Sequence, residues 1–132
     1  MTDMALNLPF TRAEYDARVA KTFAEMEARG MDVLIVTDPS NMNWLTGYDG
    51  WSFYVHQCVV LIAGEDPMWF GRGQDAAGAR RTVWMGENRI EGYPDHYVQS
   101  TERHPMDLLA SRLVDQGYPS AHIGVEMDNY WF

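Results

Sequence analysis

A strongly marked amphipathic helix near the start of the chain, followed at once by a short apolar run, is the feature that most constrains the fold. Thr11 and Glu14 form a capping-box pair, and Phe10 and Tyr15 occupy the hydrophobic-staple positions around it. Apolar residues then recur at helical spacing until a glycine ends the pattern. These features predict a helix over residues 12–29, which must bury one face against another layer.

The apolar run that follows predicts a buried strand. Residues 33–36 are all aliphatic and β-favouring, and Asp38-Pro39-Ser40 ends the run as a turn. Ser40 is a candidate N-cap for a short helix that reaches Thr46, and Gly47 is placed to terminate it. A helix–strand–helix order of this kind indicates an α/β domain.

The rest of the chain continues the alternation of helices and strands. Runs over 53–63 and 68–71 predict two strands paired as a hairpin, helices are expected over 74–83 and 105–116, and further strands over 89–93 and 122–126. We therefore predict one domain over residues 1–132, with three α/β/α layers and a mixed sheet of about five or six strands.

Composition narrows the function classes. The chain has 19 acidic and 10 basic residues, a net charge of -9, so it should repel nucleic acid and anionic lipid. Its longest apolar run, 58–63, is far below the roughly 18 residues that a membrane span needs. A single cysteine and an N-terminus without a secretory pattern favour the cytoplasm.

No catalytic or metal-binding constellation is evident. The four histidines, His56, His96, His104 and His122, are scattered without a spacing that brings two ligands together on a helix. Cys58 lies within an apolar strand, where a thiol is usually inert. The glycines of Gly71-Arg72-Gly73 lack phosphate-loop spacing, and we interpret them as turn glycines. We expect no catalytic residue, no metal and no cofactor in this domain.

Aromatic residues beside a histidine form the most distinctive group. Trp51 precedes the predicted strand over 53–63, and alternation along that strand sends Tyr54 and His56 to one face. These three residues are therefore candidate substrate-binding residues. The alternative is that aromatics at a strand start fill the core, and the pattern leaves both open.

At this point the sequence resembles a known family. The segment 38–48, Asp-Pro-Ser-Asn-Met-Asn-Trp-Leu-Thr-Gly-Tyr, is similar to the N-x-x-Y-L-T-G-Y/F segment of creatinase/prolidase N-terminal domains. The segments 49–57, 71–75 and 92–99 together resemble the ectoine hydrolases of that family.

The resemblance implies a function in a larger protein. Catalysis in the family belongs to a C-terminal "pita-bread" domain, with either a two-metal site or a metal-free site, and we expect that this domain is absent from the present chain. The family also implies a homodimer in which the N-terminal domain leans over the partner's active site. Tyr54 and His56 then correspond to the substrate-contacting Phe and Arg of creatinase, so the arginine is replaced here by histidine.

If the substrate is ectoine, the reaction is hydrolytic ring opening to N-acetyl-diaminobutyrate. The ring cation suits an aromatic wall from Trp51 or Tyr54, with His56 as a hydrogen-bond donor. Two alternatives remain open: a metal-dependent Xaa-Pro dipeptidase, and a free-standing α/β interaction module. The aromatic end of the chain, residues 125–132, favours a truncated protein over the free-standing module.

Overall fold

The computed structural model describes residues 8–128 as an α/β fold around a five-stranded mixed sheet. The α-helices are α1 (Arg12–Ala28), α2 (Pro39–Thr46), α3 (Ala76–Thr82) and α4 (Pro105–Asp115). The strands are β1 (Val33–Val36), β2 (Cys58–Ile62), β3 (Met68–Arg72), β4 (Ile90–Tyr93) and β5 (Ile123–Val125). Short 3-10 turns cover Ser52–Tyr54, Gly73–Asp75, Glu87–Arg89 and Asp95–Tyr97.

The sheet runs in the order β4-β3-β2-β1-β5. β2 pairs antiparallel with both β1 and β3, whereas the outer pairs, β3 with β4 and β1 with β5, are parallel. The predicted hairpin between β2 and β3 is therefore confirmed. The parallel β3–β4 pair places the ends of two segments that are distant in the sequence side by side.

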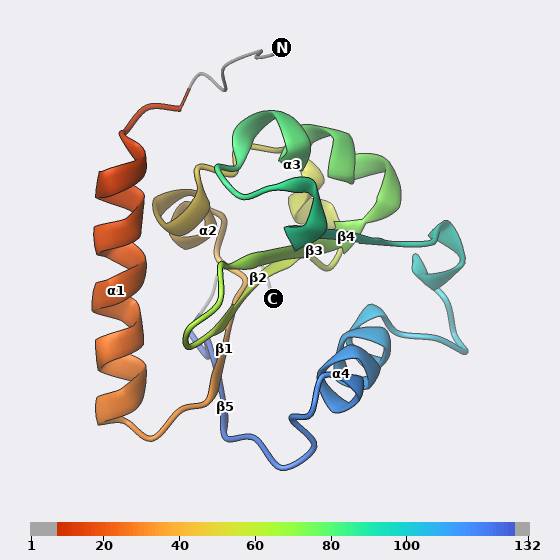
Figure 1. The fold of residues 1–132 in the computed structure, drawn as a ribbon. Coiled ribbons are helices and arrows are strands. Elements are labelled where there is room, and N and C mark those ends of the chain that lie inside the picture. Colours follow the sequence, from red (N-terminus) through yellow and green to blue (C-terminus); the bar gives the residue numbers. More distant parts are fainter. Residues whose placement is uncertain (1–7, 129–132) are drawn as a thin grey trace.

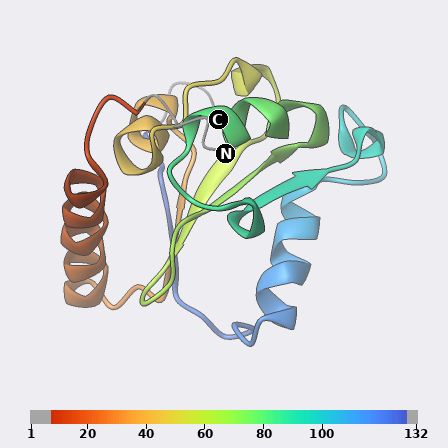
Figure 2. The same cartoon turned by 45° about the horizontal axis from the view of Figure 1, so that its top comes forward.

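Helices cover both faces of the sheet, as the three-layer prediction requires (Figures 1 and 2). One apolar cluster joins α1, α2 and α3 to one face through residues such as Tyr15, Met42 and Trp69. The other joins α4 to the opposite face through Leu109 and Leu113. Successive strand residues alternate between these clusters, which is why all five residues of β2 are buried.

Helix α1 forms as its sequence predicts. The Thr11 hydroxyl accepts a hydrogen bond from the Glu14 N–H at 3.2 Å, and the Phe10 and Tyr15 rings meet edge to face at 6.2 Å. The Glu14 carboxylate does not complete the reciprocal bond of a capping box; it accepts from Arg18 Nε at 3.0 Å. The helix ends one residue before the predicted boundary, at Ala28.

Three local predictions are wrong in detail. Asp38, not Ser40, is the N-cap of α2, since its carboxylate accepts from the Ser40 and Asn41 N–H groups and proline then starts the helix. The interpretation of Gly71 as a turn glycine is wrong, since Gly71 lies within β3 as the strand prediction over 68–71 requires, whereas Gly73 does lie in a 3-10 turn. A Cβ on Gly71 would clash with the Trp69 ring. Gly47 does end α2, with a left-handed φ of 86°.

The third correction concerns the predicted strand over 53–63, which begins only at Cys58. Before it, the chain makes a 3-10 turn closed by the Val55 N–H on the Ser52 carbonyl at 3.1 Å. A buried hydrogen-bond network stabilises the turn: Gln57 Oε1 accepts from the hydroxyl groups of both Ser52 and Tyr48. Satisfying these buried polar groups takes precedence over extending the strand.

Two observations concern the described range as a whole. Within residues 8–128, no helix has the length and apolar character needed to cross a membrane. Of the aromatic end over residues 125–132, residues 129–132 lie outside the described residues.

Candidate functional site

A small pocket opens where the 3-10 turn before β2, the end of β4 and the start of α4 meet. Its volume is about 140 Å³. An apolar cavity of about 150 Å³ holds a benzene molecule, so this pocket has room for one six-membered ring. The lining residues are Tyr54, Val55, His56, Tyr93, Tyr97, Val98, Gln99 and Pro105.

The structure brings two of the three predicted site residues together. Tyr54 and His56 both line the pocket. Trp51 precedes them by a few residues in the sequence but does not line the pocket, and it is 81% exposed. The reason differs from the predicted one: neither residue lies on a strand, so alternation cannot place them on one face. The turn over 52–54 and the extended residue after it carry them to the same side.

His56 is held next to a second histidine. Its ring centroid lies 4.4 Å from that of His104, the N-cap of α4, whose Nδ1 accepts from the Met106 N–H at 3.1 Å. Burial, and secondarily His104, lower the pKa of His56 below its usual value. His56 is therefore neutral at pH 7 and acts as a hydrogen-bonding group, not as a fixed charge.

Tyr93 fixes the backbone of His56. Its hydroxyl donates to the His56 carbonyl at 2.6 Å, and its ring packs between Phe70 at 5.5 Å and Tyr97 at 6.3 Å. Burial raises the pKa of Tyr93 to about 12, so the hydroxyl remains a donor. A buried tyrosine thus ties the pocket to the end of β4.

A charged group lies beside the pocket. Arg72 Nε donates to Asp95 Oδ1 at 2.9 Å, and this contact lowers the pKa of the Asp95 carboxyl. Asp75 lies close enough to both for their charges to affect it, and burial raises its pKa. Within the described part of the chain, Asp75 Oδ2 is enclosed without a hydrogen-bond partner. Asp75 also precedes α3, but its side chain makes no capping hydrogen bond to that helix.

Two glycines allow this close packing of segments. A Cβ on Gly92 would lie 2.7 Å from the Gly73 Cα, so the turn after β3 can lie this close to β4 only because position 92 lacks a side chain. A Cβ on Gly73 would make a tight contact of 3.2 Å with the Tyr93 carbonyl oxygen. The glycines of segments 71–75 and 92–99 therefore bring Arg72 and Asp95 together.

Sequence reasoning missed much of this site. Tyr93, Tyr97, Arg72, Asp75 and Asp95 were not candidate binding residues, although they lie in the segments 71–75 and 92–99 that carried the family resemblance. What was missing was the parallel pairing of β3 with β4, which sets Arg72 opposite Tyr93. Local patterns do not encode which strands pair.

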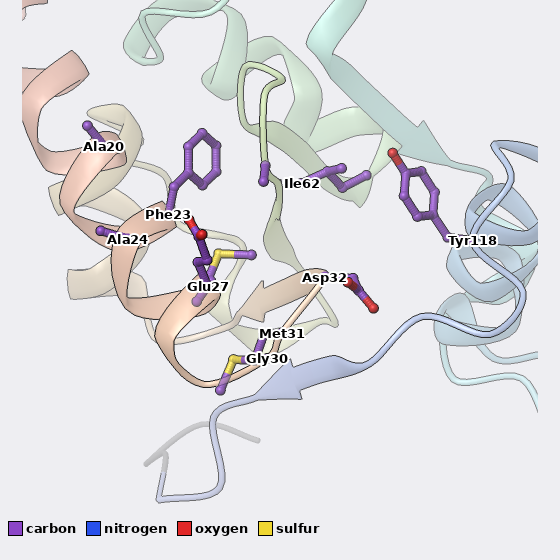
Figure 3. A pocket seen from close by; sticks show the side chains of 11 residues that line it. Ala20, Phe23, Ala24, Glu27, Gly30, Met31, Asp32, Ile62 and Tyr118 are labelled. Carbon is purple, nitrogen blue, oxygen red and sulfur yellow. The ribbon is translucent and has the colours of Figure 1, made fainter.

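A larger groove lies at the opposite end of β1 and β2 and has different chemistry. Its volume is about 680 Å³, and Figure 3 shows side chains of α1 on one side, Tyr118 on the other and Ile62 between them. Its lining is mainly apolar, and its two carboxylates are Glu27 and Asp32. It brings together no histidine or cysteine, so the smaller pocket is the better candidate for specific chemistry.

Cys58 lies fully buried in β2, where burial raises the pKa of its thiol to about 12. Within residues 8–128, no three His, Cys, Asp or Glu side chains converge as a metal-binding group.

Comparison with known proteins places the chain in a family context. Residues 18–132 match the family described as creatinase/prolidase N-terminal domain. An ectoine hydrolase of Halomonas elongata is 57% identical over 128 residues, which cover 96% of this chain and 32% of that protein. An uncharacterized hydrolase/peptidase of Sinorhizobium fredii is 42% identical over 126 residues, covering 95% of this chain and 32% of that protein. The chain thus spans about a third of the length of these curated relatives.

Solved structures share the fold. A proline dipeptidase of Streptococcus pneumoniae superposes with a TM-score of 0.65 at 22% identity, covering 85% of this chain and 75% of that one. The N-terminal domain of an Xaa-Pro dipeptidase of Lactobacillus brevis gives a TM-score of 0.68 at 16% identity, covering 83% and 75%.

Proposed function

The chain belongs to the creatinase/prolidase N-terminal domain family, and from this premise we propose that it is the non-catalytic N-terminal domain of an ectoine hydrolase-like enzyme. The reaction is hydrolytic ring opening of ectoine to N-acetyl-diaminobutyrate, carried out by a C-terminal catalytic domain. The 57% identity with an ectoine hydrolase supports this substrate over that of the more distant dipeptidases.

One observation carries the proposed role of this domain: Tyr54 and His56 converge on a pocket sized for a single ring. The Tyr54 ring supplies an aromatic face that attracts a delocalised ring cation, and the neutral His56 supplies a directional hydrogen bond. Both features suit ectoine, whose ring is cationic and whose substituent is a carboxylate.

The exposure of the pocket rim supports a role in a dimer. Tyr54 is 54% exposed and Trp51 is 81% exposed, and large aromatic residues of this kind are enriched at protein interfaces. In the proposed homodimer this surface covers the active site of the partner subunit. Tyr54 and His56 then contact substrate that the partner's catalytic domain holds, with Trp51 at the rim.

The substrate and the metal dependence are tested on the full-length protein. Hydrolysis of ectoine and of an Xaa-Pro dipeptide is measured with and without a chelator. Ectoine hydrolysis supports the proposal, and chelator resistance assigns the catalytic domain to the metal-free type. Chelator-sensitive dipeptide cleavage without ectoine hydrolysis assigns the domain to an Xaa-Pro dipeptidase instead.

The role of the pocket is tested by His56→Ala in the full-length enzyme. Loss of a hydrogen bond to substrate should raise the KM for ectoine by about 5- to 30-fold, the equivalent of roughly 1–2 kcal/mol. His122→Ala is the matched control, because His122 is 84% exposed and pairs with Asp32 outside the pocket. Equal kinetics for His56→Ala and the control would remove His56 from the site.

A further inference from the structure

Arg72 is paired with a pocket-lining residue and is already oriented. It ends β3 opposite Tyr93 of β4, the residue that binds the His56 carbonyl. Its side chain is 20% exposed, and its Nε donates a hydrogen bond to Asp95 Oδ1 at 2.9 Å. The Asp95 contact therefore fixes the direction of the guanidinium, on a residue paired with the pocket-lining Tyr93.

The contact with Asp95 leaves the guanidinium able to bind a second acceptor. A guanidinium carries five N–H donors in one plane, and the Asp95 contact uses Nε. The Asp95 side chain is 66% exposed, so this ion pair lies against solvent and a ligand can approach it. The planar fork of arginine matches a carboxylate better than any other side chain does.

The charges around Arg72 select the class of ligand. One guanidinium faces two carboxyl groups, Asp75 and Asp95, so the local charge is at or below zero. A simple anion therefore gains little electrostatic binding energy at Arg72. A zwitterion gains more, because its carboxylate can bind Arg72 while its cationic part lies against the aromatic faces of the pocket and near the acidic side chains.

We propose that Arg72 is the residue with which this domain binds the carboxylate of a small zwitterionic substrate, and that Asp95 is its positioning residue. This inference rests on the proposed function, which supplies the substrate.

The test compares binding of ectoine and of its carboxamide, which lacks the negative charge, by calorimetry on the full-length protein. Arg72→Gln should weaken ectoine binding by about 10- to 100-fold, the range that a charge-assisted hydrogen bond supplies. The affinity for the carboxamide should change less than about twofold, since the carboxamide has no negative charge to pair with the Arg72 guanidinium. Arg72→Lys should retain part of the preference for the acid, because it keeps the charge but loses the fork.

Two further variants separate binding from structure. Arg80→Gln is the matched control, because Arg80 makes a comparable exposed ion pair, with its Nε at 2.7 Å from Glu87 Oε1, and should leave the preference unchanged. Asp95→Asn should reduce the preference for the acid without abolishing it, and Asp95→Glu should restore it. A purely structural Asp95 would lower the melting temperature in Asp95→Asn and leave the preference for acid over carboxamide unaltered.

The outcomes separate this inference from the proposed function. If the wild type hydrolyses ectoine and Arg72→Gln keeps the full preference for the acid, the inference is wrong and the proposed function stands. If the wild type cleaves an Xaa-Pro dipeptide instead, the proposed function fails, and the same comparison on the dipeptide and its C-terminal amide decides the role of Arg72. The inference is overturned if the wild-type protein binds ectoine no better than its carboxamide and the dipeptide no better than its C-terminal amide.

Discussion

Tyr93→Phe should weaken the whole site through a single lost hydrogen bond. Tyr93 is 1% exposed and its hydroxyl donates to the His56 carbonyl at 2.6 Å, so the substitution leaves a partly buried carbonyl without its donor while keeping the ring packing. The expected cost is about 1–2 kcal/mol in the free energy of unfolding, the range for leaving one buried polar group unsatisfied. For a domain of this size that corresponds to a melting temperature lower by roughly 3–8 °C.

The assay is urea unfolding of the 132-residue chain, followed by circular dichroism and tryptophan fluorescence. Tyr118→Phe is the control: the Tyr118 hydroxyl is 3.4 Å from Glu65 Oε2, a distance at which little hydrogen-bond energy remains, so its cost should be below about 0.5 kcal/mol. The reasoning is refuted if the two variants lose equal stability, because the Tyr93 contact would then contribute nothing beyond a surface hydroxyl.

Four other results are expected. Glu126→Gln should lower the free energy of unfolding in urea by about 1–2 kcal/mol, because the carboxylate accepts from two backbone N–H groups after β1. A variant as stable as the wild type would contradict this. Gly47→Ala should cost more than about 1 kcal/mol, since φ is 86° and the new Cβ would lie 2.8 Å from the Thr82 carbonyl oxygen; full stability would show that the turn can relax. Cys58 should resist a thiol reagent in the native state and react only on unfolding, and rapid labelling contradicts its burial. The fold lowers the pKa of His56, so the stability that His56 contributes is complete above the unfolded pKa of about 6.5 and declines as pH falls below that value. The difference in free energy of unfolding between wild type and His56→Gln should therefore vary with pH below about 6.5 and stay constant above it.

Local patterns predicted the parts of the fold that local interactions determine. The start of α1 depends on Thr11 and Phe10, which act within one helical turn, and Gly47 ends α2 through its own backbone conformation. The N-cap of α2 was assigned two residues late, because Asp38 and Ser40 are both good caps and proline at position 39 favours the first helical position. Such choices lie within the reach of sequence reasoning.

The site depends on contacts that no local pattern contains. The predicted strand from residue 53 fails because Gln57 and Ser52 form a buried hydrogen-bond network with Tyr48, and strand propensity does not register that network. Arg72 meets Asp95 through the parallel pairing of β3 with β4 and the close approach that Gly92 allows. Tyr54 and His56 do line one pocket, but they precede β2 and do not lie on a strand.

The most direct test of the account is subunit complementation in the full-length enzyme. Two differently tagged subunits are co-expressed and the mixed dimer is isolated: one carries Tyr54→Ala and His56→Ala with an intact catalytic domain, and the other carries the intact N-terminal domain with an inactivated catalytic domain. If Tyr54 and His56 act on the partner's substrate, the mixed dimer should hydrolyse ectoine although each parent homodimer is impaired. A mixed dimer no more active than the parents would contradict the proposal that this domain completes the partner's active site.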